Sequence, residues 1–162
     1  MPEIMQEKFL ITPEGFSRLE GEVTTLKTKD RPAVIKAIAE ARAHGDLSEN
    51  AEYHAAKEKQ GFLEAKIAAL EAWLSRAEVV DIRKLSGDQV VFGTTVTLED
   101  EETGKKSVFR IISDYEANMQ LGHISINSPV AKALLGRVSG NDVEVATPGG
   151  TKYYRILKVE YK

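Results

Sequence analysis

Two carboxylates, Asp46 and Glu49, stand three positions apart in the stretch EARAHGDLSENAEYHAAKE, residues 40–58. Carboxylate oxygens are good ligands for Mg²⁺, but the ion takes about six oxygens in octahedral geometry and gives up water reluctantly. Two exposed acids therefore hold it poorly alone, and could complete a site whose other ligands belong to a partner. The same spacing is that of a capping box, in which the acids would only begin a helix and gain from its dipole.

The surroundings of the pair favour chemistry over capping alone. Glu40 and Glu52 lie within two helical turns and add negative charge, which disfavours the isolated fold. Ser48, Asn50 and Tyr53 give the same short region a polar surface. Such a group of residues is useful at an exposed apex that reaches another molecule.

Two long helical patterns flank this region and must position it. Their apolar residues recur at the coiled-coil spacing of three and four, and are Phe16, Leu19, Val23 and Leu26 in the first, and Leu63, Ile67, Leu70, Leu74 and Ala77 in the second. We predict helices over about 13–44 and about 47–79, folded back on each other at Gly45. Thr12 and Pro13 form a good helix start, while Pro32 predicts a kink or break near residues 29–32.

The hairpin is expected to be narrow near its apex. Alanine dominates there, which predicts closely packed arms, and at about 1.5 Å per residue each arm of some 30 residues reaches about 45 Å. Gly21 and Gly61 suggest close packing or local bending. A structural spacer does not need a slender tip, whereas a probe that enters a narrow channel does.

The hydrophobic period changes to two from about residue 87. The segment from Val90 to Ser113 predicts three strands with a turn at 101–104, and HISIN predicts another. Ser128 and Pro129 are expected to begin a short helix that stops at Gly136, and a hairpin with a Pro-Gly-Gly turn follows. We therefore predict an α+β fold with three parts: a hairpin over residues 1–80 with its tip at 45–50, a linker at 81–86, and a small globular domain over 87–162.

Composition excludes several classes of function. The chain has 162 residues and no cysteine, which removes disulfides, thiolate metal sites and cysteine nucleophiles. The net charge is −3, with 11 basic against 14 acidic residues in 1–80 and 11 of each in 81–162. This balance does not suit a duplex-DNA binder, so nucleic-acid contact should be local or through a partner. The sequence has no secretory signal or membrane span, and we expect a cytoplasmic protein.

The stretch EARAHGDLSENAEYHAAKEKQGF closely resembles the signature of the bacterial Gre transcript-cleavage factors, the GreA type in particular. ISINSPVAKALLG and the C-terminal TPGG and ILKVEY segments extend the similarity over nearly the whole chain. The resemblance implies an antiparallel coiled coil followed by a globular domain of FKBP-like topology. It also implies a transcription elongation factor that binds RNA polymerase at its secondary channel and inserts the hairpin. The polymerase's own cleavage of backtracked RNA is then stimulated, so the factor is not an independent enzyme.

The resemblance also implies roles for residues at the tip. Asp46 and Glu49 match the acids that help to hold a second, weakly bound Mg²⁺ jointly with the polymerase, and no metal is expected in the isolated protein. Asn50 and Tyr53 match positions that support the tip or contact RNA, although both could be ordinary helix-surface residues.

Basic residues on the hairpin match a patch that contacts the displaced RNA 3′ segment. Arg42 and Lys57 are the matching positions, and Lys59 lies beside them. The alternative is that these side chains only form helix-surface ion pairs, worth about 0.2–0.5 kcal/mol each. Asn127, Ser128 and Pro129 match the loop that docks on the polymerase. A capped helix start explains Ser128 and Pro129 as well, and both explanations can hold together.

Two other functions compete with this interpretation. A prolyl isomerase needs an apolar pocket walled by aromatic side chains, and Phe92, Phe109 and Tyr115 are sparse for that purpose. The sole tryptophan, Trp73, lies on the predicted coiled coil. A scaffold that holds partners apart would need no charge at its tip, so substitutions at Asp46 and Glu49 discriminate it from a cleavage factor.

Overall fold

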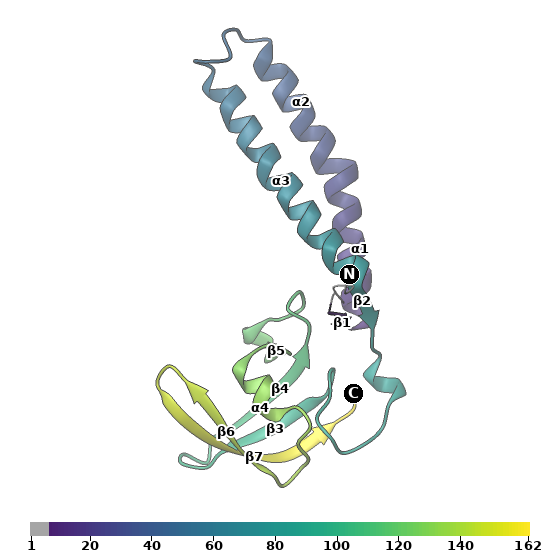
Figure 1. Ribbon diagram of the computed structural model, residues 1–162, viewed down its shortest axis with the longest axis vertical. Coiled ribbons are helices and arrows are strands. Elements are labelled where there is room, and N and C mark those ends of the chain that lie inside the picture. Colours follow the sequence, from purple (N-terminus) through teal and green to yellow (C-terminus); the bar gives the residue numbers. More distant parts are fainter. Residues whose placement is uncertain (1–6) are drawn as a thin grey trace, which may run out of the picture. The chain divides into compact units, whose positions relative to one another are not determined.

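The computed structural model describes residues 7–162 and divides into two compact units (Figure 1). One contains Phe16–Ala77 and the other combines Lys8–Gly15 with Glu78–Lys162. The predicted α+β class is confirmed: the first unit is a helical hairpin and the second is built on a curled sheet. No helix among residues 7–162 is both long and apolar enough to cross a membrane.

The first arm of the hairpin is helical throughout but changes its hydrogen-bonding pattern near the middle. It consists of α1 (Pro13–Thr25), a π-helical turn (Leu26–Asp30) and α2 (Arg31–Arg42). The turn lies next to Pro32, as expected for a residue that has no backbone N–H to donate to the preceding turn. The N–H of Arg31 donates instead to the carbonyl of Leu26, so the irregularity is a π turn and not a break in the helix.

The second arm is α3 (Ala51–Arg76), which at about 1.5 Å per residue is roughly 39 Å long. It begins four residues later than the predicted position 47 and ends at Arg76, because Ala77–Val79 forms strand β2 instead of helix. Figure 1 shows α2 and α3 side by side up to the loop that joins them. Four residues of the predicted apolar seam are buried: Leu19, Val23, Ile67 and Leu70. Val34 and Ala41 of the first arm are buried as well, whereas the other predicted seam residues, Phe16, Leu26, Leu63, Leu74 and Ala77, are only partly buried.

Ion pairs join the two arms along their exposed edges. Arg31 binds Glu64 through two hydrogen bonds of 2.8 Å, Lys66 lies 3.3 Å from Glu22, and Lys27 pairs with Glu71. The residues of these three pairs lie at similar distances along the chain on either side of the loop, as expected for antiparallel arms.

The α+β unit starts with β1 (Phe9–Ile11), which pairs with β2 in a two-stranded sheet that sequence reasoning missed. Thr12 then caps α1 as predicted, because its hydroxyl accepts a hydrogen bond of 3.0 Å from Gly15 N–H. Glu116, from a distant loop of the same unit, accepts hydrogen bonds from both the N–H and the hydroxyl of Thr12. A short 3-10 turn (Ile82–Lys84) follows β2.

The main sheet has five strands in the order β5-β4-β3-β7-β6. Their bounds are β3 (Thr95–Asp100), β4 (Lys106–Ile112), β5 (His123–Ser125), β6 (Asp142–Thr147) and β7 (Gly150–Glu160). Only the β4–β5 pair is parallel, and a 3-10 turn (Met119–Leu121) precedes β5. The predicted first strand is wrong, since residues 87–92 contribute a single bridge between Gln89 and Val138.

Helix α4 (Pro129–Leu134) packs on this sheet, and its capping is as predicted. The hydroxyl of Ser128 accepts from Ala131 N–H, and Gly136, with a φ of 83°, follows the helix in the left-handed region that glycine tolerates. The core contains Ala131 and Leu134 from the helix, together with alternate strand residues such as Val96, Leu98, Ile111, Val143 and Ile156. The period-two pattern of the sequence therefore marks the buried face of the sheet.

Candidate functional site at the hairpin tip

The predicted acids lie in the loop between α2 and α3, at residues 43–50, and both are exposed. Neither of them begins α3. The N-cap is Asn50, whose side-chain oxygen accepts a 3.0 Å hydrogen bond from the N–H of Tyr53. The capping-box explanation of Asp46 and Glu49 is therefore wrong, because the helix begins at Ala51 and its cap is Asn50.

Asp46 is held by the residue two positions ahead of it. Both the backbone N–H and the hydroxyl of Ser48 donate to the same oxygen, Oδ1, at 3.0 and 2.9 Å. These hydrogen bonds, the backbone one first, lower the pKa of the Asp46 carboxyl from its ordinary value of 3.8. The group is therefore a carboxylate at neutral pH, and its second oxygen, Oδ2, takes no part in these contacts.

Asn50 also ties the two arms together at the apex. Its Nδ2 donates a 2.5 Å hydrogen bond to the carbonyl of Ala41, a buried residue near the end of α2. One side chain thus caps α3 and satisfies a carbonyl of α2. Tyr53 is half-buried, and its ring meets that of His54 edge to face at 5.6 Å between centroids.

The three predicted basic residues are exposed on the hairpin near the tip. Arg42 is the last residue of α2, Lys57 lies in the second turn of α3, and Lys59 lines a groove of about 140 Å³ between the arms. Lys57 donates to Gln60 at 3.2 Å. The alanines Ala33, Ala37 and Ala56 line the same groove, so small side chains near the tip leave a shallow hollow instead of a tight seam.

The residues at the tip suit part of a Mg²⁺ site, but not a complete one. Within residues 7–162, no group of three or more histidine, aspartate or glutamate side chains could hold a metal ion. Asp46 and Glu49 supply the hard oxygen donors that Mg²⁺ prefers, but far fewer than the roughly six it requires. The donor set therefore suits an ion that another molecule also binds.

The other predicted site residues lie in the α+β unit, in the segment after β5 and at the first residue of α4. Asn127 and Pro129 are exposed and Ser128, which caps α4, is half-buried. Asn127 is fixed by Asp114, which accepts from its Nδ2 at 3.0 Å and also accepts from the hydroxyl of Ser125. Sequence reasoning missed Asp114, because its partners are 11 and 13 residues away and meet it only in the folded sheet.

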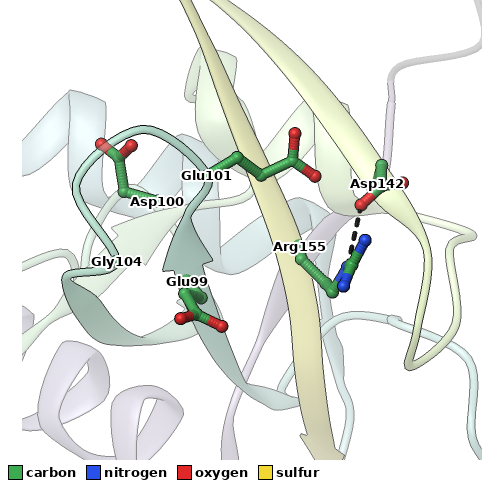
Figure 2. A pocket seen from close by; sticks show the side chains of 6 residues that line it. All are labelled: Glu99, Asp100, Glu101, Gly104, Asp142 and Arg155. Carbon is green, nitrogen blue, oxygen red and sulfur yellow. Dashed lines mark hydrogen bonds and ion pairs between the residues drawn. The ribbon is translucent and has the colours of Figure 1, made fainter.

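Two cavities of the α+β unit lack the aromatic walls that an isomerase pocket needs. One cavity has a volume of about 390 Å³, and Glu99, Asp100 and Glu101 are among the residues that line it (Figure 2). In this cavity Arg155 donates a 3.1 Å hydrogen bond to Asp142. A hydrogen bond with Asp142 raises the pKa of Glu101, as expected where carboxyl groups gather on one surface. A second cavity, of about 470 Å³, is lined by Lys132, Ala133, Leu135, Arg137, Glu144 and Ala146. Neither has an aromatic wall.

Comparisons with known proteins cover both units. Residues 9–79 match the family model described as "Transcription elongation factor, N-terminal", and residues 85–161 match "Transcription elongation factor, GreA/GreB, C-term". Transcription elongation factor GreA of Phenylobacterium zucineum is 54% identical over 155 residues, which are 96% of this chain and 99% of that protein. GreA of Rhodospirillum rubrum is 53% identical with the same coverage.

Among solved structures, GreA factor homolog 1 (Gfh1) of Thermus thermophilus is 29% identical, covers 95% of this chain and 99% of its own, and has a TM-score of 0.45. The family assignment depends on the sequence matches, which span both units in order. They confirm the resemblance carried by the tip and C-terminal motifs, and the chain belongs to the GreA/GreB family of transcription elongation factors.

Proposed function

We propose that this chain binds RNA polymerase, inserts its hairpin through the secondary channel and stimulates the polymerase's Mg²⁺-dependent cleavage of backtracked RNA. One observation carries the proposal: two exposed carboxylates stand at the end of a hairpin whose helices they do not cap. An exposed carboxylate that lies in the loop at the end of the hairpin and caps neither helix is available to a partner. The names of the relatives, all transcription elongation factors, support the choice of polymerase as that partner.

In this proposal the tip supplies ligands and orientation, and the polymerase supplies the active site. Asp46 and Glu49 would hold one Mg²⁺ jointly with the polymerase and orient the attacking water. When bound, such an ion stabilises negative charge on the attacking and leaving oxygens of a phosphodiester. The chain is therefore an accessory factor and not an independent nuclease.

The remaining predicted residues have supporting roles in the same proposal. Arg42, Lys57 and Lys59 offer positive charge to the phosphates of the displaced RNA 3′ segment. The loop of Asn127, Ser128 and Pro129 is the proposed docking element, held rigid by the helix cap and by Asp114. The proposal also implies a cytoplasmic protein, and it needs no binding of duplex DNA by the chain alone.

The test is RNA cleavage by a stalled, backtracked polymerase with the Asp46→Asn and Glu49→Gln variants. In Asp46→Asn the amide carbonyl can still accept from Ser48, so the loop is kept, but the amide nitrogen then takes the place of Oδ2 and repels a cation. We expect each variant to reduce stimulated cleavage at least about tenfold at limiting Mg²⁺, equivalent to about 1.4 kcal/mol of transition-state stabilisation.

Glu58→Gln is the matched control, since Glu58 is an exposed acid of α3 away from the loop. It should stimulate cleavage like the original chain, and circular dichroism should report the same helix content for all variants. If Asp46→Asn and Glu49→Gln also stimulate normally, the catalytic proposal is wrong and the tip serves a scaffold.

A further inference from the structure

The carboxylate of Glu116 collects hydrogen bonds from two segments that are far apart in the sequence. The N–H of Thr12 donates to Oε2 at 3.3 Å, the hydroxyl of Thr12 donates to Oε1, and the hydroxyl of Ser113 donates to Oε2 at 2.7 Å. Thr12 and Ser113 are both buried. Hydrogen bonds to an ionised group are stronger than those between neutral groups, and removal of the acceptor would leave buried donors unpaired. Glu116 is therefore a strong attachment between the two segments.

The residue that Glu116 holds is the one that begins the hairpin. Thr12 precedes α1, and its hydroxyl accepts a 3.0 Å hydrogen bond from Gly15 N–H while it donates to Glu116. Gly15 leaves room for the Glu116 side chain, because a Cβ at that position would overlap it. Glu116 therefore lies against both the cap and the first turn of α1.

The boundary between the two compact units runs through this helix. Lys8–Gly15 belongs to the α+β unit and Phe16–Ala77 to the hairpin, although α1 is continuous from Pro13 to Thr25. Because backbone hydrogen bonds join each turn of a helix to the next, whatever holds the first turn also holds the start of the arm.

Arg83 contacts the same turn of α1, but at the surface. Its Nη2 lies 2.9 Å from Oε1 of Glu14, and both side chains are exposed. Exposed ion pairs contribute little, because water and salt screen them. Arg83 is therefore a natural comparison for Glu116: it reaches the same turn through a weak contact.

We infer that Glu116 is a positioning residue: it fixes the base of the hairpin in the α+β unit, so that docking of this unit on the polymerase also fixes where the first arm begins. This inference rests on the proposed function and adds to it a residue outside both the tip and the proposed docking element. Glu116 touches neither RNA nor metal in this role and acts only through Thr12 and the first turn of α1.

The experiment uses the full-length chain with four substitutions. Glu116→Ala loses all three bonds, whereas the amide oxygen of Glu116→Gln can still accept from the Thr12 hydroxyl. Thr12→Ser keeps the N–H and the hydroxyl, and Arg83→Gln is the matched control. The first readout is amide hydrogen exchange of Thr12 and Gly15 by NMR in the isolated protein. Exchange should be about tenfold faster in Glu116→Ala, intermediate in Glu116→Gln, and unchanged in Thr12→Ser and Arg83→Gln.

The second readout is RNA cleavage by a backtracked polymerase over a concentration series of the factor. Glu116→Ala should lower the rate at saturating factor about tenfold, since a misplacement far from the reacting atoms can cost that much. The concentration for half-maximal cleavage should be unchanged, because the docking element is intact. A mere loss of folded protein, which circular dichroism would also report, would instead raise that concentration and leave the saturated rate as it was.

The outcomes separate this inference from the proposed function. If Asp46→Asn abolishes stimulation while Glu116→Ala leaves the exchange rates or the saturated cleavage rate unchanged, the inference is wrong and the proposed function stands. If Asp46→Asn has no effect on cleavage, both are rejected. A defect in Arg83→Gln or Thr12→Ser as large as that in Glu116→Ala also overturns the inference, because the bonds to Glu116 would then not be its cause.

Discussion

At the scale of residues, two polar side chains, Asn50 and Ser48, organise the tip. Asn50 does the structural work that the spacing of Asp46 and Glu49 suggested for the acids: it caps α3 and binds the carbonyl of Ala41. Ser48 binds Asp46. The acids therefore cap neither helix, and both are exposed in the loop.

The two roles of Asn50 predict an order of stability. Asn50→Ser keeps a good capping oxygen but is too short to reach Ala41, while Asn50→Ala loses both bonds. We expect Asn50→Ser to lower the free energy of unfolding of the hairpin by about 0.5–1.5 kcal/mol, the usual net value of a hydrogen bond. Asn50→Ala should lower this free energy of unfolding by about 1 kcal/mol more, because it also loses the helix cap.

Urea unfolding followed by circular dichroism in the far ultraviolet measures both differences. The Glu58→Gln variant should unfold like the original chain in the same experiment. Equal stabilities for the alanine and serine variants would mean that the cap contributes nothing to the hairpin.

At the scale of elements, two glycines in the hairpin arms lower the stability of the helices. Gly21 and Gly61 are exposed in helical segments, and a Cβ added to either would meet nothing within 4 Å. The expectation that they permit close packing is therefore wrong. Both glycines cost helix stability, because glycine loses more backbone entropy than alanine, and no packing of the hairpin requires them.

Gly61→Ala and Gly21→Ala should each raise the free energy of unfolding of the hairpin by about 0.5–1 kcal/mol. Gly15→Ala is the informative contrast: its Cβ would overlap the side chain of Glu116, which Thr12 and Ser113 hold in place. That variant should be less stable than the original chain, despite the better helix propensity of alanine. Thermal unfolding compares the three, and a stabilised Gly15→Ala would show that Glu116 moves freely.

At the scale of the whole molecule, the two units are stabilised differently. The α+β unit has a continuous core of strand and helix residues, whereas the hairpin buries a single seam and adds ion pairs between its arms. The stability of the hairpin should therefore depend more on charge, and so on pH, than that of the sheet.

The Arg31–Glu64 pair predicts the direction in which the stability of the hairpin changes with pH. Its hydrogen bonds lower the pKa of Glu64 below the ordinary value of 4.5, so the unfolded chain binds the proton more tightly. The pair's contribution is complete above about pH 4.5 and is lost as the pH falls through the folded pKa. Glu64→Gln should reduce stability at about pH 7, and this difference should shrink as the pH falls below about 4.5 and through the folded pKa of Glu64, as urea unfolding over a pH series would report.

Glu101 provides a control, because its pKa is shifted in the opposite direction to that of Glu64. Its pKa is raised above the ordinary value of 4.5 by the hydrogen bond with Asp142, so its carboxylate form costs stability once the pH rises above that value. Glu101→Gln should therefore stabilise the protein at about pH 7 and have little effect at about pH 3. The same direction of change for Glu64→Gln and Glu101→Gln would contradict the assignment of these shifts.

The sequence by itself determined the elements and most of the tip. Apolar residues spaced by three and four marked two arms, because a helix repeats every 3.6 residues, and alternation marked β3, β4 and β6, because a strand repeats every two. Local signals also sufficed for the caps at Thr12 and Ser128, whose hydrogen bonds span three residues. The position of Asp46 and Glu49 at the apex followed from the arms alone.

Only the tertiary structure decided which residue does what at that apex. Asn50, which caps α3, also binds the carbonyl of Ala41, nine residues earlier, and that contact exists only once the arms have met. The contacts of Glu116 with Thr12, and of Asp114 with Asn127, likewise join segments that are separate in the sequence. A side-chain hydrogen bond joins atoms that are only a few ångströms apart. A sequence pattern predicts such a bond only when the two residues lie within one or two helical turns of each other along the chain.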